Sequence, residues 1–240
     1  SSEWDSQLCR LFSDAPPKKI YSLASLELAR AAVRCRDEKD MPIVAFDLAG
    51  QEDGFPAGDH WRAYQHAHTN FLKKTVHAGE AYGPESIFEA ITELHADRIG
   101  HGYHLFSPEL CGPKVSNPHD YVGRLARYIA DRRITIEVCI TSNMQTNPNI
   151  ASVKDHHFGR MLEERLSATL CTDNRLHSYT TVSREVRLAV DAFEMDMKQL
   201  RNTIIYGFKR SFFPGRYQEK RDYVRKVIDH YDRVISEHVG

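Results

Sequence analysis

The sequence predicts an α/β protein in which parallel strands alternate with helices, as in part of a (β/α)8 barrel. Five short apolar runs each precede a longer segment whose apolar residues recur at helical spacing. The runs stay apolar almost to their last residue, which is typical of strands covered on both faces. Polar residues follow each run, and in a (β/α)8 barrel the carboxyl ends of the strands carry the active site.

The same patterns place each element along the chain. Strands are expected at 41–50, 75–80, 98–102, 134–143 and 167–174, with helices at 22–39, 58–74, 84–95, 120–133 and 157–166. Beyond 174 the pattern predicts only helices, at 180–196, 197–212 and 217–238. Residues 1–21 contain Pro16-Pro17 and mixed charges, and are predicted to be a loose connector ahead of a barrel domain over 22–240.

The composition limits the class of protein and of partner. The chain is 41% hydrophobic and 27% charged, which excludes a disordered chain, collagen and a coiled coil. Its net charge of −1 gives no whole-chain field for nucleic acid or an anionic membrane, so a small-molecule partner is expected. The oligomeric state is left open. Five scattered cysteines and an N-terminus without a secretory pattern predict a cytoplasmic location.

Four residues at the predicted strand ends form a candidate site: His77, Glu80, His101 and Asp173. Imidazole and carboxylate groups are ligands that zinc prefers, and zinc lowers the pKa of water to near neutrality. A neighbouring carboxyl group can then deliver a proton to a substrate. Taken singly, each signal is weak: His77 and His101 are more often hydrogen-bonded structural histidines, and Asp173 could equally cap the following turn. Their common position at one edge of the sheet favours a site.

The sequence offers weaker alternatives to this site. No glycine-rich phosphate motif occurs, which weighs against a doubly wound sheet. His66-Ala67-His68 resembles a metal pair, but residues two apart on a helix do not share a face. His156-His157 is a weaker candidate pair in a predicted loop. The basic residues of the last helix alternate with acids, which predicts a solvated face rather than an RNA-binding surface.

Five segments, in this order, resemble the adenosine deaminase family of metal-dependent hydrolases: VAFDLAGQE (44–52), TVHAGEAYG (75–83), DRIGHGYHL (97–105), IEVCITSNMQT (136–146) and TLCTDN (169–174). The resemblance implies hydrolytic deamination of adenosine, or a related aminopurine, to inosine and ammonia with zinc as cofactor. It implies that His77 and Asp173 are zinc ligands and that Glu80 protonates purine N1. It further implies that His101 orients the attacking hydroxide, that the Gly50 backbone contacts purine N3, and that Asn174 faces N7.

The resemblance covers the C-terminal two-thirds of the family's fold and leaves part of the metal site out. The family's first strand ends in an H-x-H pair that supplies two further zinc ligands, and this chain has no such strand. The five strands would then be the last five of eight, so the 240-residue chain alone is expected to be inactive. The alternative function is a metal-free, inactive relative that acts as a binding or interaction module. The presence of Glu80, His101 and Asp173 opposes that alternative.

Two departures from the family pattern concern the substrate. Asn174 stands where many relatives have a second aspartate, and Ile140 stands where proline is common. The Asn174 amide can still donate a hydrogen bond to a ring nitrogen. The reaction class is therefore unchanged, while the exact purine is left open.

Overall fold

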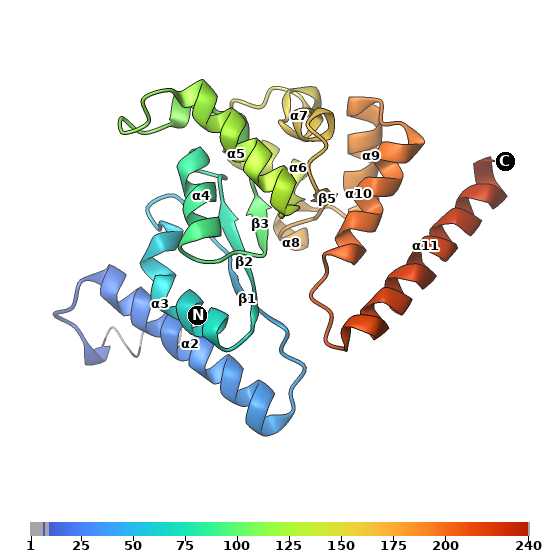
Figure 1. The fold of residues 1–240 in the computed structure, drawn as a ribbon. Coiled ribbons are helices and arrows are strands. Elements are labelled where there is room, and N and C mark those ends of the chain that lie inside the picture. The colour runs from blue at the N-terminus through green and yellow to red at the C-terminus, as the bar shows by residue number, and fades with distance from the viewer. Residues whose placement is uncertain (1–6, 8–9, 240) are drawn as a thin grey trace.

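The centre of the molecule is a parallel sheet of five strands. The computed structural model describes residues 7 and 10–239. The strands lie side by side in chain order (Figure 1): β1 (Ala45–Leu48), β2 (Lys73–Ala78), β3 (Arg98–His101), β4 (Thr135–Val138) and β5 (Ala168–Leu170). Each neighbouring pair is parallel, and the register places Ala78 of β2 opposite His101 of β3. The carboxyl ends of the strands therefore share one edge of the sheet.

Helices alternate with these strands and then continue alone to the C-terminus. The α-helices are α2 (Pro17–Lys39), α3 (Trp61–Thr69), α4 (Pro84–Thr92), α5 (Pro118–Arg132), α6 (Ile140–Thr146), α7 (Phe158–Glu163), α8 (Arg175–Ser178), α9 (Val182–Phe193), α10 (Met197–Lys209) and α11 (Tyr217–Val239). Short 3₁₀ turns occupy Ala57–His60, Tyr103–Phe106, Pro108–Leu110 and Val153–Asp155. Helix α10 packs beside β5, and α11 packs against α10 at the edge of the molecule (Figure 1).

The two faces of the sheet differ in character. Val76, Ile99 and Ile136 are fully buried in one hydrophobic core with residues of the covering helices. On the alternate positions, Thr75 donates a hydrogen bond to Glu137, and Arg98 pairs with Glu137 at 2.5 Å. Because successive side chains on a strand point to opposite faces, the second face is polar. The prediction that the strands are apolar on both faces is therefore wrong for this second face of the sheet.

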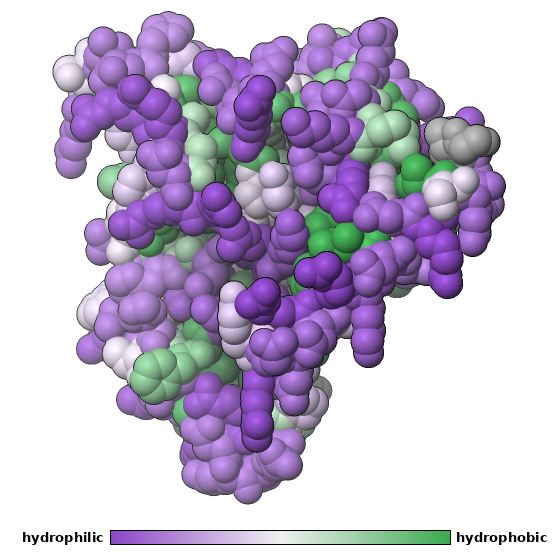
Figure 2. All heavy atoms as spheres, turned by 45° about the vertical axis from the view of Figure 1, so that its right-hand side comes forward, coloured by the Kyte–Doolittle hydropathy of each residue, from purple (hydrophilic) through white to green (hydrophobic). Residues whose placement is uncertain are grey.

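The predicted α/β class is confirmed, as is an incomplete barrel followed by C-terminal helices. The five strands do not close into a barrel, since β1 and β5 each pair with one other strand among the described residues. Each of the five predicted strands corresponds to an observed one; β2 has the predicted length but begins two residues earlier, and the other four observed strands are shorter. The surface seen in Figure 2 is mostly hydrophilic, with smaller hydrophobic areas between. Within residues 7 and 10–239, no helix has both the length and the apolar character of a membrane span.

Two boundaries differ from the prediction for identifiable reasons. Helix α2 begins at Pro17 rather than at 22, because proline is pre-organised for the first turn of a helix. Residues 17–21 are thus helical and not part of a loose connector, while residues 1–6, 8 and 9 lie outside the described part. The predicted fourth strand ends at Val138, and α6 begins at Ile140. The buried carboxylate of Glu185 accepts hydrogen bonds from the Thr141 amide and hydroxyl, which stabilises the start of that helix.

Candidate functional site

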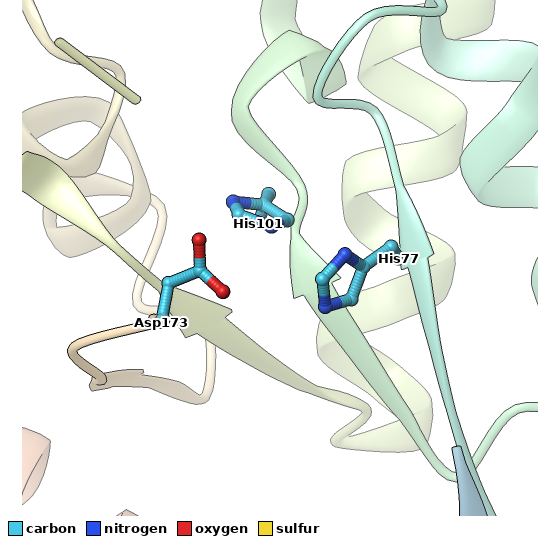
Figure 3. A group of neighbouring side chains, drawn as sticks. All are labelled: His77, His101 and Asp173. Atoms are coloured by element: carbon cyan, nitrogen blue, oxygen red, sulfur yellow. The ribbon is translucent and has the colours of Figure 1, made fainter. Parts of the chain in front are cut away.

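Three side chains from separate strands converge at the carboxyl edge of the sheet. His77 lies near the end of β2, His101 ends β3, and Asp173 follows β5. One ligand atom from each lies within 4.8 Å of the other two. Figure 3 shows the Asp173 carboxylate directed at the two imidazoles. The rings of His77 and His101 meet edge to face, with centroids 4.6 Å apart. The structure thus brings together three of the four residues that the sequence predicted at the centre of the site.

The backbone is strained where two of these residues leave their strands. His101 has φ of 63° and Asp173 has φ of 53°, in the left-handed region that non-glycine residues seldom adopt. Such strain costs free energy and is concentrated at functional sites. In both residues the left-handed backbone directs the side chain toward the other two residues at the carboxyl edge of the sheet. Seven other non-glycine residues of the described part also have positive φ, several of them at helix C-termini, so the strain at His101 and Asp173 marks the site only together with their convergence.

Glu80, the predicted proton donor, lies beside His101. Its Oε2 is 3.6 Å from Nε2 of His101, and its side chain is 14% exposed. Burial raises the pKa of the Glu80 carboxyl, whereas the nearby His77 and a hydrogen bond from Thr146 act in the opposite direction. A raised pKa favours the protonated carboxyl, which is the form that can give a proton away.

A buried carboxylate that sequence reasoning overlooked fixes the loop that carries Glu80. Glu52 is 5% exposed and accepts hydrogen bonds from three consecutive backbone amides: Gly79 at 3.1 Å, Glu80 at 2.7 Å and Ala81 at 2.7 Å. Gly79 also has φ of 73°, a backbone conformation that residues with a side chain rarely adopt. Glu52 lies within the segment 44–52 that carried the family resemblance, which is the one signal of it in the sequence.

The polar residues after β4 form hydrogen bonds with two residues of the site, Asp173 and His101. The Ser142 hydroxyl donates to Oδ2 of Asp173 at 2.8 Å. Asn143 contacts Nδ1 of His101 at 3.1 Å and Nε2 of His156 at 3.2 Å, and all three of these side chains are at most 2% exposed. Burial lowers the pKa of His101 to about 4 and that of His156 to about 3. The sequence placed His156 in a loop, where adjacency to His157 concealed this buried role.

The two predicted substrate contacts lie at the margins of this cluster. Gly50 and His77 line a cavity of about 740 Å³ between α2, β1 and α3, and Gly50 has φ of 116°. Asn174 is exposed, and its side-chain oxygen caps α8 by accepting from the His177 amide at 3.3 Å. The candidate pair His66 and His68 lies in α3, where the ring of His68 stacks on that of His95.

The residues that are present fit a zinc ion in chemical type. Imidazole and carboxylate form the donor set, and zinc accepts both. Nδ1 of His77 is buried and has no hydrogen-bond partner among the described residues. His77, His101 and Asp173 each offer a possible ligand atom, and Ser142 donates a hydrogen bond to the Asp173 carboxylate.

Comparisons with known proteins agree with this geometry. Residues 18–230 match the adenosine deaminase family. The chain is 39% identical over 208 residues to an adenosine deaminase of Mycobacterium sp. (strain JLS), covering 87% of this chain and 55% of the relative. The chain thus spans about half the length of the curated relatives it matches.

Solved structures show the same fold at lower identity. An N6-mAMP deaminase of Arabidopsis superposes with a TM-score of 0.67 at 24% identity, over 87% of this chain and 55% of that one. An amidohydrolase from Burkholderia ambifaria with bound Zn gives a TM-score of 0.67 at 22% identity, over 88% of this chain and 56% of that one. With the sequence match and the converged strand ends, these findings establish that the chain belongs to the adenosine deaminase family.

Proposed function

We propose that this chain carries the proton-transfer residues and part of the metal site of a zinc-dependent deaminase. The reaction is hydrolysis of the 6-amino group of adenosine, or of a related aminopurine, to give inosine and ammonia. The observation that carries the proposal is the convergence of His77, His101 and Asp173 within 4.8 Å, with Glu80 beside them. The scattered cysteines support a cytoplasmic location.

Glu80 acts as the proton donor in this proposal. Attack of water on C6 of the purine is easier once N1 is protonated, because the ring then accepts the electron pair. The partly buried Glu80 carboxyl, with its raised pKa, delivers that proton. The bound Glu52 carboxylate holds the Gly79–Ala81 amides, so the Glu80 backbone keeps its position while the proton moves.

The remaining residues orient the reactants. His101 donates a hydrogen bond toward the attacking oxygen, and Asp173 and His77 hold the metal. When bound, zinc supplies a Lewis acid that lowers the pKa of water to near neutrality. The Gly50 backbone contacts purine N3, and the NH₂ group of Asn174 donates to N7 while its oxygen caps α8. The position of Gly50 beside the cavity next to His77 supports its part of this scheme.

The number of metal ligands sets the expected activity of the 240-residue chain. His77 and Asp173 are two ligands, whereas catalytic zinc sites use three from the protein. We therefore expect the chain alone to bind zinc weakly and to turn over adenosine slowly or not at all. We call the chain extended at its N-terminus by the family's first strands, with the H-x-H pair that the resemblance implies, the joined protein. This extension is expected to supply further metal ligands and to restore turnover.

The test measures zinc content and the conversion of adenosine to inosine by ultraviolet absorbance. The chain, the joined protein and a joined Asp173→Ala variant are compared. We expect one zinc per joined protein with turnover, and loss of both in Asp173→Ala. A joined protein that binds zinc but deaminates no aminopurine contradicts the proposed reaction. A joined protein without zinc favours the metal-free binding module, and rapid turnover by the chain alone contradicts the ligand argument.

A further inference from the structure

A line of buried hydrogen bonds runs from the backbone of α7 to the mouth of the site. The Phe158 amide donates to Nδ1 of His156 at 3.0 Å. Nε2 of His156 lies 3.2 Å from Oδ1 of Asn143, and Nδ2 of Asn143 lies 3.1 Å from Nδ1 of His101. Nε2 of His101 then faces Oε2 of Glu80 at 3.6 Å.

The backbone amide at one end decides the direction of every bond in this line. A peptide N–H is always a donor, so Nδ1 of His156 must be the acceptor and carries no proton. The proton of His156 is therefore on Nε2, which donates to Asn143. Asn143 must then present its oxygen to His156 and its NH₂ group to His101.

The opposite arrangement fails at the Phe158 amide. If the Asn143 amide were turned over, its NH₂ group would face His156, whose Nε2 would have to accept. The proton of His156 would then move to Nδ1 and oppose the Phe158 N–H across 3.0 Å. A protonated His156 ring would fail in the same way, because its Nδ1–H would also face the Phe158 N–H. The opposed donors would be shielded from bulk solvent, since the three side chains are at most 2% exposed, and two facing donors buried in this way are costly.

We propose that Asn143 and His156 are positioning residues that hold His101 as the neutral tautomer with its proton on Nε2. Nδ1 of His101 is occupied by the donor from Asn143, and Nε2 presents an N–H to Glu80 and the mouth of the site. In this tautomer neither ring nitrogen offers a free lone pair. His101 is then a hydrogen-bond donor, and neither a metal ligand nor a base that accepts a proton at Nε2.

The consequence for catalysis rests on the proposed function, whereas the tautomer itself does not. In deamination, an N–H directed at the attacking oxygen orients it and stabilises negative charge as it develops. The metal would be held by His77 and Asp173 with ligands from elsewhere, although His101 lies within the same 4.8 Å cluster. Asn143 and His156 touch no substrate in this scheme and act through His101.

The tautomer is tested by nitrogen NMR on the metal-free chain with ¹⁵N-labelled histidine. A protonated ring nitrogen and an unprotonated one resonate at well separated positions, so each nitrogen of His101 is identified separately. His101→Gln assigns its signals by their loss. We expect Nε2 of His101 at the protonated position and Nδ1 at the unprotonated one. A proton on Nδ1 of His101 in the wild-type chain overturns the proposal.

Variants test whether the line fixes this state. Asn143→Asp keeps the shape and the bond from His156, but a carboxylate can only accept, so Nδ1 of His101 is expected to shift to the protonated position. His156→Gln retains a donor toward Asn143, and the His101 signals should stay in place. The neighbouring His157 bonds instead to the Tyr103 carbonyl, so His157→Gln is the matched control. Unchanged His101 signals in Asn143→Asp contradict the proposal, and if that variant does not fold the wild-type spectrum decides.

Activity provides a second, separable measurement in the joined protein. Loss of one donor to a developing oxyanion lowers kcat by about 10²–10³-fold, so Asn143→Asp should lower kcat with a smaller effect on KM. His156→Gln should retain most of the activity. The NMR measurement needs neither metal nor substrate. The tautomer can therefore be confirmed while the deaminase function fails, or refuted while adenosine is still turned over.

Discussion

Nε2 of His101 lies 3.6 Å from Oε2 of Glu80, and this pair joins the proposed proton donor to the residue proposed to orient the attacking oxygen. The two residues come from the ends of different strands, and both are largely buried. Burial raises the pKa of Glu80 and lowers that of His101, so each group is driven toward its neutral form. A neutral acid beside a neutral imidazole suits a neutral purine ring better than an ion pair would.

Glu80→Gln is expected to abolish proton delivery without disturbing the metal. Glutamine keeps the size and the contact with Thr146 but has no acidic proton, so kcat in the joined protein should fall by about 10²–10⁴-fold. Zinc content, measured by atomic absorption, should be unchanged. Glu93 is exposed at the end of α4, so Glu93→Gln serves as the control. Full activity in Glu80→Gln would assign the proton to another group.

Glu52→Gln is expected to destabilise the fold and to misplace Glu80. Its carboxylate receives three backbone N–H groups, and glutamine would direct an NH₂ group at some of these donors. The loss of charge-assisted hydrogen bonds lowers the free energy of unfolding by about 2 kcal/mol. Urea denaturation followed by circular dichroism measures this loss.

The exposed neighbour Asp53 provides the control for Glu52. Asp53→Asn changes a carboxylate to an amide at the next residue, where the side chain is exposed, so its unfolding free energy should match wild type. An equal loss of stability in Glu52→Gln and Asp53→Asn would show that the amide cluster has no special part. In the joined protein, kcat should fall in Glu52→Gln alone.

The order of strands and the residues at their ends follow from the sequence, because both depend on local pattern. Apolar runs that end in polar residues predict that His77, Glu80, His101 and Asp173 share one edge of the sheet. Glu52 and His156 were not assigned roles, because their contacts join residues 28 and 13 positions apart. The start of α6 was missed for the same reason, since its Glu185 partner is 44 positions away. Long-range hydrogen bonds leave no periodic signal in a sequence.

His156 is expected to make the fold sensitive to acid. Burial lowers its pKa from 6.5 to about 3, so the folded state favours the neutral ring. Its contribution is fully present above the unfolded-state pKa of 6.5 and is lost progressively as pH falls from 6.5 toward the folded-state pKa of about 3. Between pH 7.5 and pH 5 the unfolding free energy should fall by about 2 kcal/mol from this group.

The pH dependence is measured by urea denaturation at the two pH values. His156→Gln cannot titrate, so its loss of stability between pH 7.5 and pH 5 should be smaller than that of wild type by about 2 kcal/mol. His119 is exposed in the first turn of α5, so His119→Gln should keep the wild-type dependence. The same pH dependence in His156→Gln and wild type would mean that another group is responsible.

Gly100→Ala is expected to remove zinc binding by displacing His77. Gly100 lies opposite His77 in the β2–β3 register, and a Cβ atom there would lie 2.7 Å from Cδ2 of the imidazole and 3.4 Å from Cα. Since the strand backbone is held by its neighbours, the imidazole of His77 must leave its present position. The zinc affinity of the joined protein, measured by competition with a chelator, should fall by about tenfold or more.

Gly123 provides the control for Gly100. At Gly123 in α5 no atom lies within 4 Å of such a Cβ, so Gly123→Ala should retain zinc and gain about 0.5–1 kcal/mol of stability. Equal zinc affinity in the two variants would exclude His77 as a ligand.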